Sequence, residues 1–192
     1  VSLAIPNSVT DIENFAFDGC ISLSSIILSE SLTTINRCVF NKCSSLENVV
    51  IPNTVETIRE KAFNECKNLK SIVIPNSVTE IEENDFSWAG LTEVVIPESV
   101  KKLGENAFAH CEDLKSLTIL CPITVKNIFW NNSSSLESVT LGAGIKKIDE
   151  RNFDDCVKVI NVPAKKADYY KKRLSEKLHG FIVELPAEKA KK

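Results

Sequence analysis

The sequence predicts an α/β solenoid in which each repeat of about 22–23 residues supplies one short parallel β-strand. Three observations predict it: apolar residues recur at a fixed step, prolines follow the apolar runs, and equivalent positions in successive repeats carry the same side chain. The apolar residues that end the expected strands lie 21–23 positions apart: Ile5, Leu28, Ile51, Ile74, Ile96, Ile119, Leu141 and Val162. A period in the twenties is typical of coils stacked along one axis.

Each part of the repeat has a physical interpretation. The clearest copy runs from Leu69 to Phe86 and reads LKSIVIPNSVTEIEENDF. The segment LKSIVIP is rich in β-branched residues and predicts a strand that stops at Pro75, because proline cannot donate to a β-ladder. The Asn and Ser side chains that follow favour a turn. The stretch ending in Phe predicts one helical turn on the outer side, before the chain returns to the next strand.

Identical side chains form columns along the predicted stack, as continuous burial requires. The aromatic column is Phe17, Phe40, Phe63, Phe86, Phe108 and Phe153. A second column is Ile12, Ile35, Ile58, Ile81, Leu103 and Ile148. A third is Val9, Leu32, Val55, Val78, Val100 and Ile145. We expect these columns to make up the core.

This pattern resembles the BspA-like (Treponema-type) leucine-rich repeats. The resemblance rests on IPNSVTDIENFAFDGC, IPNTVETIREKAFNEC, IPNSVTEIEENDF and IPESVKKLGENAFAHC, and it covers roughly residues 3–163. Residues 119–140 depart from the pattern, so a local irregularity is expected there, with a loop at 130–135 that protrudes. The chain opens in the tail of a repeat, and we interpret it as a fragment of a longer protein.

The cysteines recur with the repeat, which leaves a metal site, a disulfide framework, a redox relay or packing as explanations. Cys20, Cys43, Cys66, Cys111 and Cys156 share one position, and Ala89 fills it in the fourth repeat. An alanine there indicates a small apolar slot, and the Cβ spacing of stacked strands does not suit a disulfide. The column is therefore predicted to be packing. Cys38 and Cys121 fall outside it, and Cys38 is expected to be a partly exposed thiol because its equivalents include Phe15 and Lys61.

No pattern in the sequence points to catalysis, a cofactor or a metal, and an enzyme is not predicted. Only His110 and His179 are present, without a convergent Ser, Cys or Asp partner in the pattern, and no glycine-rich loop suits a phosphate. His110 is interpreted as a surface histidine, and Glu82, Glu83 and Asp85 as part of a solvated face. The net charge of −3 and the absence of a basic stripe argue against nucleic-acid binding. No apolar run reaches the roughly 18 residues of a membrane span.

The strand face is the candidate binding surface, because alternate strand residues point outward. The outward positions nearest the strand ends are Ile27, Val50, Val73, Val95, Thr118 and Thr140. Beside them run Ser25, Asn48, Ser71, Glu93, Ser116 and Ser138. An apolar stripe with a polar rim is typical of a protein-binding surface, which solenoid curvature would make concave and extended. The alternative is that Val and Ile simply suit strands, whether exposed or not.

The predicted organisation has three parts: the solenoid at 1–163, a C-terminal cap at 164–185 and a disordered tail at 186–192. The segment AKKADYYKKRLSEKLHG places Ala167, Tyr170, Leu174 and Leu178 at helical spacing, with Gly180 as a terminator. The segment FIVEL could add a final strand. Residues 164–192 carry nine basic and four acidic residues, which leaves the rest of the chain with 14 basic and 22 acidic ones.

The function rests on the resemblance, which implies similarity to adhesins on the surface of, or secreted by, host-associated bacteria and protist parasites. It implies a non-enzymatic module that binds proteins, among them host extracellular-matrix or cell-surface proteins. The alternatives are a passive spacer that projects another domain, or the recognition domain of a larger surface protein or enzyme. The ligand and the oligomeric state are not predicted.

Overall fold

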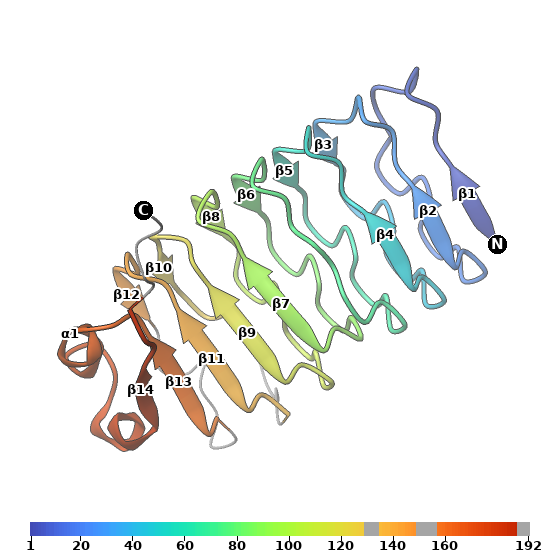
Figure 1. The fold of residues 1–192 in the computed structure, drawn as a ribbon. Helices are drawn as coiled ribbons and strands as arrows, with labels where there is room; N and C mark the ends of the chain where they lie inside the picture. Colours follow the sequence, from blue (N-terminus) through green and yellow to red (C-terminus); the bar gives the residue numbers. More distant parts are fainter. Residues whose placement is uncertain (129–134, 149–156, 188–192) are drawn as a thin grey trace.

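The computed structural model describes residues 1–128, 135–148 and 157–187, and these form a solenoid of stacked coils with parallel strands (Figure 1). The front row of strands is β1 (Ser2–Ala4), β2 (Ser25–Ile27), β4 (Asn48–Val50), β7 (Glu93–Ile96), β9 (Ser116–Ile119), β11 (Ser138–Leu141), β13 (Val159–Val162) and β14 (Ile182–Glu184). The back row is β3 (Thr34–Ile35), β5 (Thr57–Ile58), β6 (Glu80–Ile81), β8 (Lys102–Leu103), β10 (Thr124–Val125) and β12 (Lys147–Ile148). All pairings are parallel, and Ile27 lies beside Val50 one coil further on. The predicted solenoid is confirmed.

The core lies between the two rows, and its centre is a continuous stack of phenylalanine rings. Phe17, Phe40, Phe63, Phe86 and Phe108 follow one another with ring centroids 5.4–5.6 Å apart. The predicted aromatic column is therefore confirmed for these five residues, and its last member, Phe153, lies outside the described residues. The two aliphatic columns are buried through most of the middle coils and half-buried at Val9 and Ile12 in the first coil and at Leu103 in the fifth.

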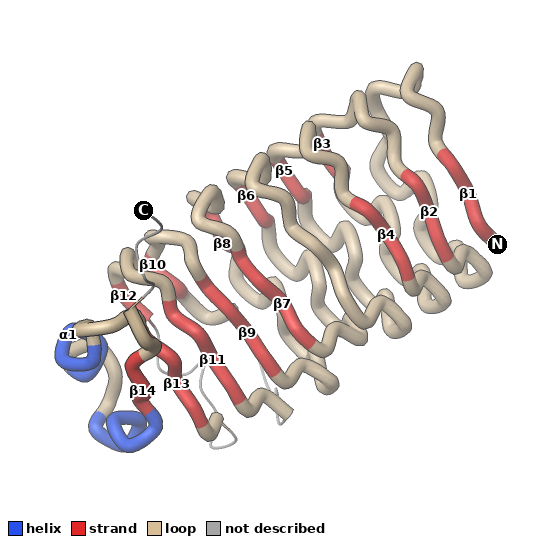
Figure 2. Tube along the Cα trace, in the orientation of Figure 1, coloured by secondary structure: helices blue, strands red, loops and turns tan. Residues whose placement is uncertain are grey.

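The outer segments differ from the predicted helical turn. In the third coil the N–H groups of Ala62, Asn64 and Cys66 close local turns at 3.1–3.3 Å. The alternate N–H groups, those of Lys61, Phe63 and Glu65, donate instead to carbonyls of the next coil at 2.8–3.2 Å. In a helix, the N–H groups bond to carbonyls of the same helix, so these bonds to the next coil do not fit a helical turn. The left-handed backbone at Lys61 and Glu65 (φ 60° and 59°) does not fit one either. Figure 2 shows these segments as loops.

The cysteine column is buried packing in which the thiols also donate hydrogen bonds. The six described cysteines are free thiols. The Sγ atoms of Cys43, Cys66 and Cys111 each donate to the carbonyl of a phenylalanine in an earlier coil at 3.1 Å. Burial raises the pKa of Cys43 and of Cys111 to about 12, which keeps both as thiols rather than nucleophilic thiolates. Cys156 lies outside the described residues.

The expectation of a partly exposed Cys38 is wrong. Its side chain is 4% exposed, and its Sγ contacts the carbonyl oxygen of Glu60 at 3.9 Å. The side chain is too short to extend past the neighbouring coil, unlike the exposed Phe15 at the equivalent position of the first coil. Burial raises the pKa of this thiol as well.

The C-terminal segment packs against the last coil, as two short elements rather than one helix. The first element is α1 (Ala167–Lys171), which is capped by Lys172. The 3₁₀-helix η2 (Glu176–Phe181) follows after Ser175, whose backbone is extended. The break lets Tyr170, Leu174 and Leu178 all be buried, while Tyr170 donates its hydroxyl to the Gly142 carbonyl. The ring of His179 also bonds the carbonyls of Lys171 and Leu174 at the break. The expected final strand is present as β14, paired with β13.

The expectations for the 130–135 loop and for the tail concern mostly 129–134 and 188–192, which lie outside the described residues. Within the described part of the chain, no helix has the length and apolar content needed to cross a membrane.

The front row is interrupted in the fourth coil. Residues 71–74 form no strand, and no backbone hydrogen bond joins them to another described residue, although β4 and β7 lie on either side of them in the row (Figure 2). The back row and the phenylalanine stack are continuous at this level. The coil is therefore held by its side chains and its back strand, with its front backbone groups unpaired.

We expect the amides of Ile72 and Ile74 to exchange with deuterium at least about tenfold faster than those of Ile26 and Val94, although all four side chains are buried. The reason is that an amide without a carbonyl partner needs no opening of the ladder before it exchanges. Native-state hydrogen exchange followed by NMR measures this. Equal protection at the four amides would show that the front ladder is continuous in solution.

Candidate protein-binding surface

The six outward positions predicted from the sequence form one row on the front of the solenoid, the strand-face stripe: Ile27, Val50, Val73, Val95, Thr118 and Thr140. The four apolar members are 62%, 68%, 80% and 51% exposed. Thr118 and Thr140 are half-buried. Four large β-branched side chains in successive coils therefore lie in solvent, next to one another.

Strand alternation and register place these side chains. Ile26 and Val49, one position earlier in β2 and β4, point into the core and are buried. The parallel register sets Ile27 beside Val50, and Val95 beside Thr118 and then Thr140. Paired strands are about 4.8 Å apart, so the members of the stripe on paired strands are in reach of one another, whereas Val73 lies in a segment that forms no strand. The second predicted column follows the same register at Ser25–Asn48 and at Glu93–Ser116–Ser138.

The stripe is longer than the sequence predicts. The register adds Ala4 beside Ile27 at one end, and Asn161 and Val183 after Thr140 at the other. Val183 is 49% exposed, and the Asn161 amide donates to the Thr140 hydroxyl at 3.2 Å. The segment FIVEL was the signal for Val183, since any strand added in register presents one residue to the stripe.

Charged residues of both signs flank the front row where each coil enters its strand. Glu47, Lys70, Lys115, Glu137 and Lys158 are exposed there. Lys158 bonds Glu137 at 2.9 Å and lowers the pKa of its carboxyl, and Lys70 bonds Asp113 at 2.6 Å. The edge of the stripe therefore mixes charges in local pairs, while Glu93 is the one charged member of the two predicted columns.

The two histidines lie in different parts of the structure. His110 stacks on Trp88 with ring centroids 4.1 Å apart, and His179 serves the cap. Within residues 1–128, 135–148 and 157–187, no three His, Cys, Asp or Glu side chains are grouped closely enough to hold a metal ion.

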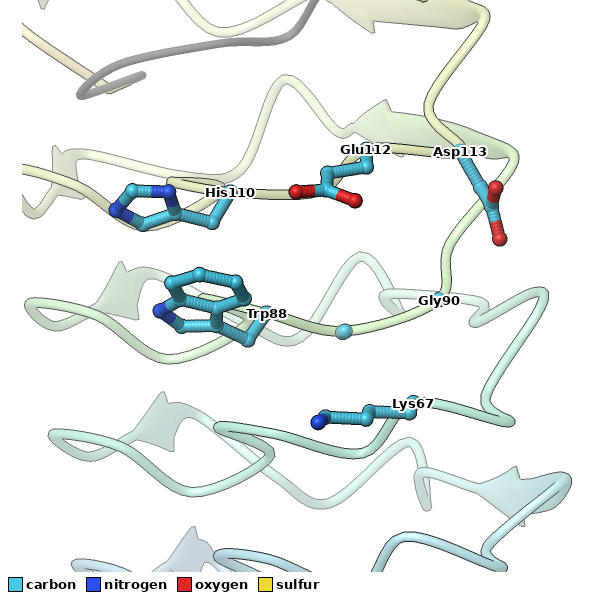
Figure 3. Close-up of a pocket in the computed structure, with 7 residues that line it drawn as sticks. Lys67, Trp88, Gly90, His110, Glu112 and Asp113 are labelled. Atoms are coloured by element: carbon cyan, nitrogen blue, oxygen red, sulfur yellow. The ribbon is translucent and has the colours of Figure 1, made fainter.

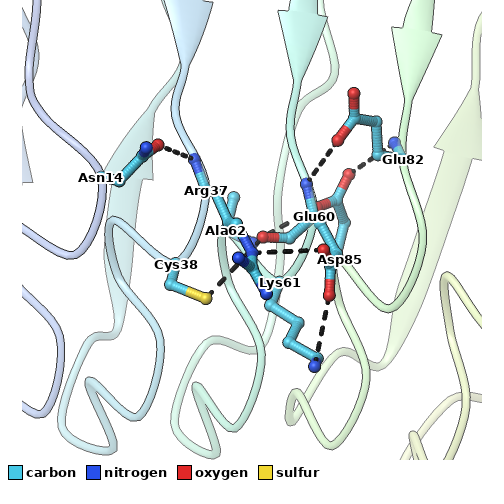
Figure 4. A network of polar contacts seen from close by, with 8 residues as sticks. All are labelled: Asn14, Arg37, Cys38, Glu60, Lys61, Ala62, Glu82 and Asp85. Carbon is cyan, nitrogen blue, oxygen red and sulfur yellow. Dashed lines mark hydrogen bonds and ion pairs between the residues drawn. The ribbon is translucent and has the colours of Figure 1, made fainter.

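The interpretation of the outer carboxylates as a solvated face is wrong for Asp85, whose side chain is fully buried. It replaces the alanine that precedes the column phenylalanine in other repeats, such as Ala62. Its carboxylate accepts the N–H groups of Ala62 at 3.2 Å and Glu82 at 2.8 Å, beside the ion pair of Glu60 with Arg37 (Figure 4). Burial raises the pKa of Asp85 well above its usual value; the two N–H bonds oppose the rise, and the Glu82 and Glu60 carboxylates add to it.

Comparison with solved structures finds the same architecture in several bacterial proteins. The T. pallidum leucine-rich repeat protein TpLRR is 28% identical with a TM-score of 0.69, and the match covers 92% of this chain and 79% of that one. A leucine-rich repeat protein from Bacteroides ovatus is 21% identical with a TM-score of 0.59, over 96% and 69%. The pneumococcal vaccine antigen PcpA is 19% identical with a TM-score of 0.74, over 97% of this chain and 56% of that one. These last two likenesses concern the fold alone.

Comparison with curated proteins finds no match. The family described as "BspA type Leucine rich repeat region" matches in six copies, over residues 1–115 and 33–160. These matches span most of the coils described above and include the column residues and the front strands. The chain therefore belongs to the BspA-type leucine-rich-repeat family.

Proposed function

We propose that this chain is a non-enzymatic protein-binding module of a cell-surface or secreted adhesin, and that the strand-face stripe contacts host proteins. The observation that carries the proposal is the run of four exposed apolar side chains in successive coils, at Ile27, Val50, Val73 and Val95. Apolar side chains gathered in one place on a surface, with a polar edge, are typical of sites that a partner covers.

The packing of the solenoid supports this role physically. Because the core columns and both rows of strands are continuous on either side of the fourth coil, Ile27, Val50 and Val95 are held by a framework that needs little ordering on binding. A preorganised surface loses less entropy when it meets its partner. A partner that lies across the front strands would cover Ser25, Asn48 and Ser71 together with the apolar stripe.

We expect Val50→Ser/Val73→Ser/Val95→Ser to weaken binding to a host protein about tenfold or more, since each buried apolar contact at the centre of an interface contributes on the order of 1 kcal/mol or more. The change should leave the fold intact, because exposed substitutions usually alter stability by about 0.5 kcal/mol each. Surface plasmon resonance against an array of purified extracellular-matrix and cell-surface proteins measures the first effect, and thermal unfolding the second.

A matched control is Phe15→Asn/Ile21→Ser, which removes exposed apolar side chains from outside the stripe. It should bind like the unchanged chain. If the stripe variant also binds unchanged, the adhesin proposal is wrong and the module acts as a spacer. The stacked rings stiffen the solenoid, which suits a spacer. A spacer should show no binding on this face that changes when the stripe residues are replaced.

A further inference from the structure

An exposed aromatic pair lies on the turn side of the solenoid, away from the strand-face stripe. Trp88 is 44% exposed, and His110 of the next coil covers one face of its ring at 4.1 Å with planes 13° apart. Both residues have left-handed backbone, at φ 60° and 58°. Glycine suits this conformation best, and Gly19 occupies the equivalent position in the first coil. A bulky aromatic ring is held here, at the tip of a turn, without being part of the core.

The chain is one residue shorter beside this pair, and a cavity lies there. The fourth repeat has Ala89-Gly90 before its strand where the third has Cys66-Lys67-Asn68. A Cβ on Gly90 would come within 2.0 Å of the Lys67 carbonyl, so the backbone passes close to the preceding coil at this point. The cavity has a volume of about 230 Å³, and Figure 3 shows Trp88 and His110 one above the other with Glu112 and Lys67 around them.

A second cavity of about 350 Å³ is lined in part by the same two residues, Trp88 and His110. Its other lining groups include the amide side chains of Asn64, Asn84 and Asn106. The Asn106 Oδ1 is buried without a hydrogen-bond partner among the described residues. The Asn64 Nδ2 already donates to Asn41 at 2.7 Å, which leaves its own oxygen free to accept. The Asn106 oxygen is closed to solvent, so a ligand in this cavity would meet the side chains of Asn64 and Asn84 instead.

The chemistry of these groups selects the ligand class. The electron-rich face of an aromatic ring attracts C–H groups that carry slight positive charge, and amide side chains both donate to and accept from hydroxyls. Charges of both signs border the pair, at Lys67, Glu112 and Asp113, and the last is engaged by Lys70. The surroundings therefore favour neither an anion nor a cation. A pyranose ring combines a C–H face with a hydroxyl edge and is neutral.

We infer that the Trp88–His110 pair is a saccharide-binding site, in which a pyranose packs on the indole and its hydroxyls bond the amides of the adjoining cavity. The Asn64 oxygen accepts one of these hydroxyls. The site is separate from the strand-face stripe and does not depend on the protein-binding function proposed above.

The test is titration of the chain with neutral oligosaccharides of glucose, galactose and N-acetylglucosamine, followed by the indole N–H signals in ¹H–¹⁵N NMR spectra. The chain has two tryptophans, and Trp88→Phe assigns the signal. We expect saturable shifts of the Trp88 signal with at least one saccharide. Trp88→Gly, which copies the residue of the first coil, should weaken binding about tenfold or more, measured by isothermal titration calorimetry because this variant lacks the reporting indole. Asn84→Gly, suited to its φ of 59°, should weaken it about fivefold.

Phe15→Asn is the matched control, because it removes an exposed aromatic residue from another left-handed turn and installs the asparagine found at 84 and 106. It should bind saccharide unchanged, and far-UV circular dichroism should be the same for all variants. The inference is overturned if no neutral saccharide shifts the Trp88 signal, if Trp88→Gly binds equally well, or if only tetramethylammonium or inorganic phosphate, added as charged probes, produces saturable shifts.

Discussion

Phe63→Ala should lower the free energy of unfolding by about 3–5 kcal/mol, as for other fully buried aromatic residues. Phe63 lies at the centre of the ring stack, 5.4 Å from Phe40 and 5.5 Å from Phe86, and its side chain is not exposed. The alanine would leave a cavity between two rings, which the continuous back row of strands helps to keep from closing. Because each coil contacts only its neighbours, the change should also uncouple the two halves of the solenoid.

Urea unfolding followed by circular dichroism measures both effects, the second as a lower dependence of the free energy on urea concentration. Phe17→Ala is the matched control, since Phe17 has a ring on one side only and is half-buried. It should cost clearly less than Phe63→Ala. Equal losses for the two variants, or a loss below about 1 kcal/mol at Phe63, would contradict the importance of the stack.

Asp85→Ala should raise the free energy of unfolding at neutral pH by about 1–3 kcal/mol, by analogy with other buried charges replaced by apolar residues. Asp85 is fully buried, and the backbone donors it serves have second acceptors: Ala62 N–H reaches the Arg59 carbonyl at 3.1 Å, and Glu82 N–H reaches that of Ile58 at 3.0 Å. Alanine occupies the same position in the third and fifth coils, at Ala62 and Ala107, so the space accepts it.

The same change should remove a pH dependence whose sign follows from the pKa. Burial raises the pKa of Asp85 in the folded chain, whereas the unfolded value is about 3.9. The folded state then retains a proton that the unfolded state releases, so the stability that Asp85 contributes is complete below about pH 4 and falls as pH rises toward the folded pKa. The unchanged chain should lose stability over this range relative to Asp85→Ala.

Chemical unfolding at several pH values between 4 and 8 checks the prediction about Asp85. Glu83→Ala, a neighbouring exposed carboxylate, is the control and should follow the unchanged chain at every pH. If Asp85→Ala destabilises the chain at neutral pH, the bonds of the carboxylate to Ala62 and Glu82 outweigh the penalty of burying its charge.

The sequence by itself determined the parallel solenoid, its core columns and the outward side of each front strand. A repeat of 21–23 residues carries the same side chain to the same place in every coil, so one copy such as 69–86 determines the environment of the others. For this reason the stack of Phe40, Phe63 and Phe86 and the exposure of Val50 and Val73 agree with the pattern. The saccharide site and the binding role of the stripe stay proposals.

Only the tertiary structure decided the features that depend on contacts between coils. Asp85 is buried because the alanine slot in which it lies is closed by the coils on either side, and nothing in the local sequence ENDF distinguishes it from the exposed Glu83. In the outer segments that the structure describes, the predicted helical turns are replaced by loops because alternate N–H groups bond to the next coil. The cap breaks at Ser175 so that Tyr170 and Leu178 can both reach the last coil. In each case the competing partner comes from another coil, and the local pattern does not contain it.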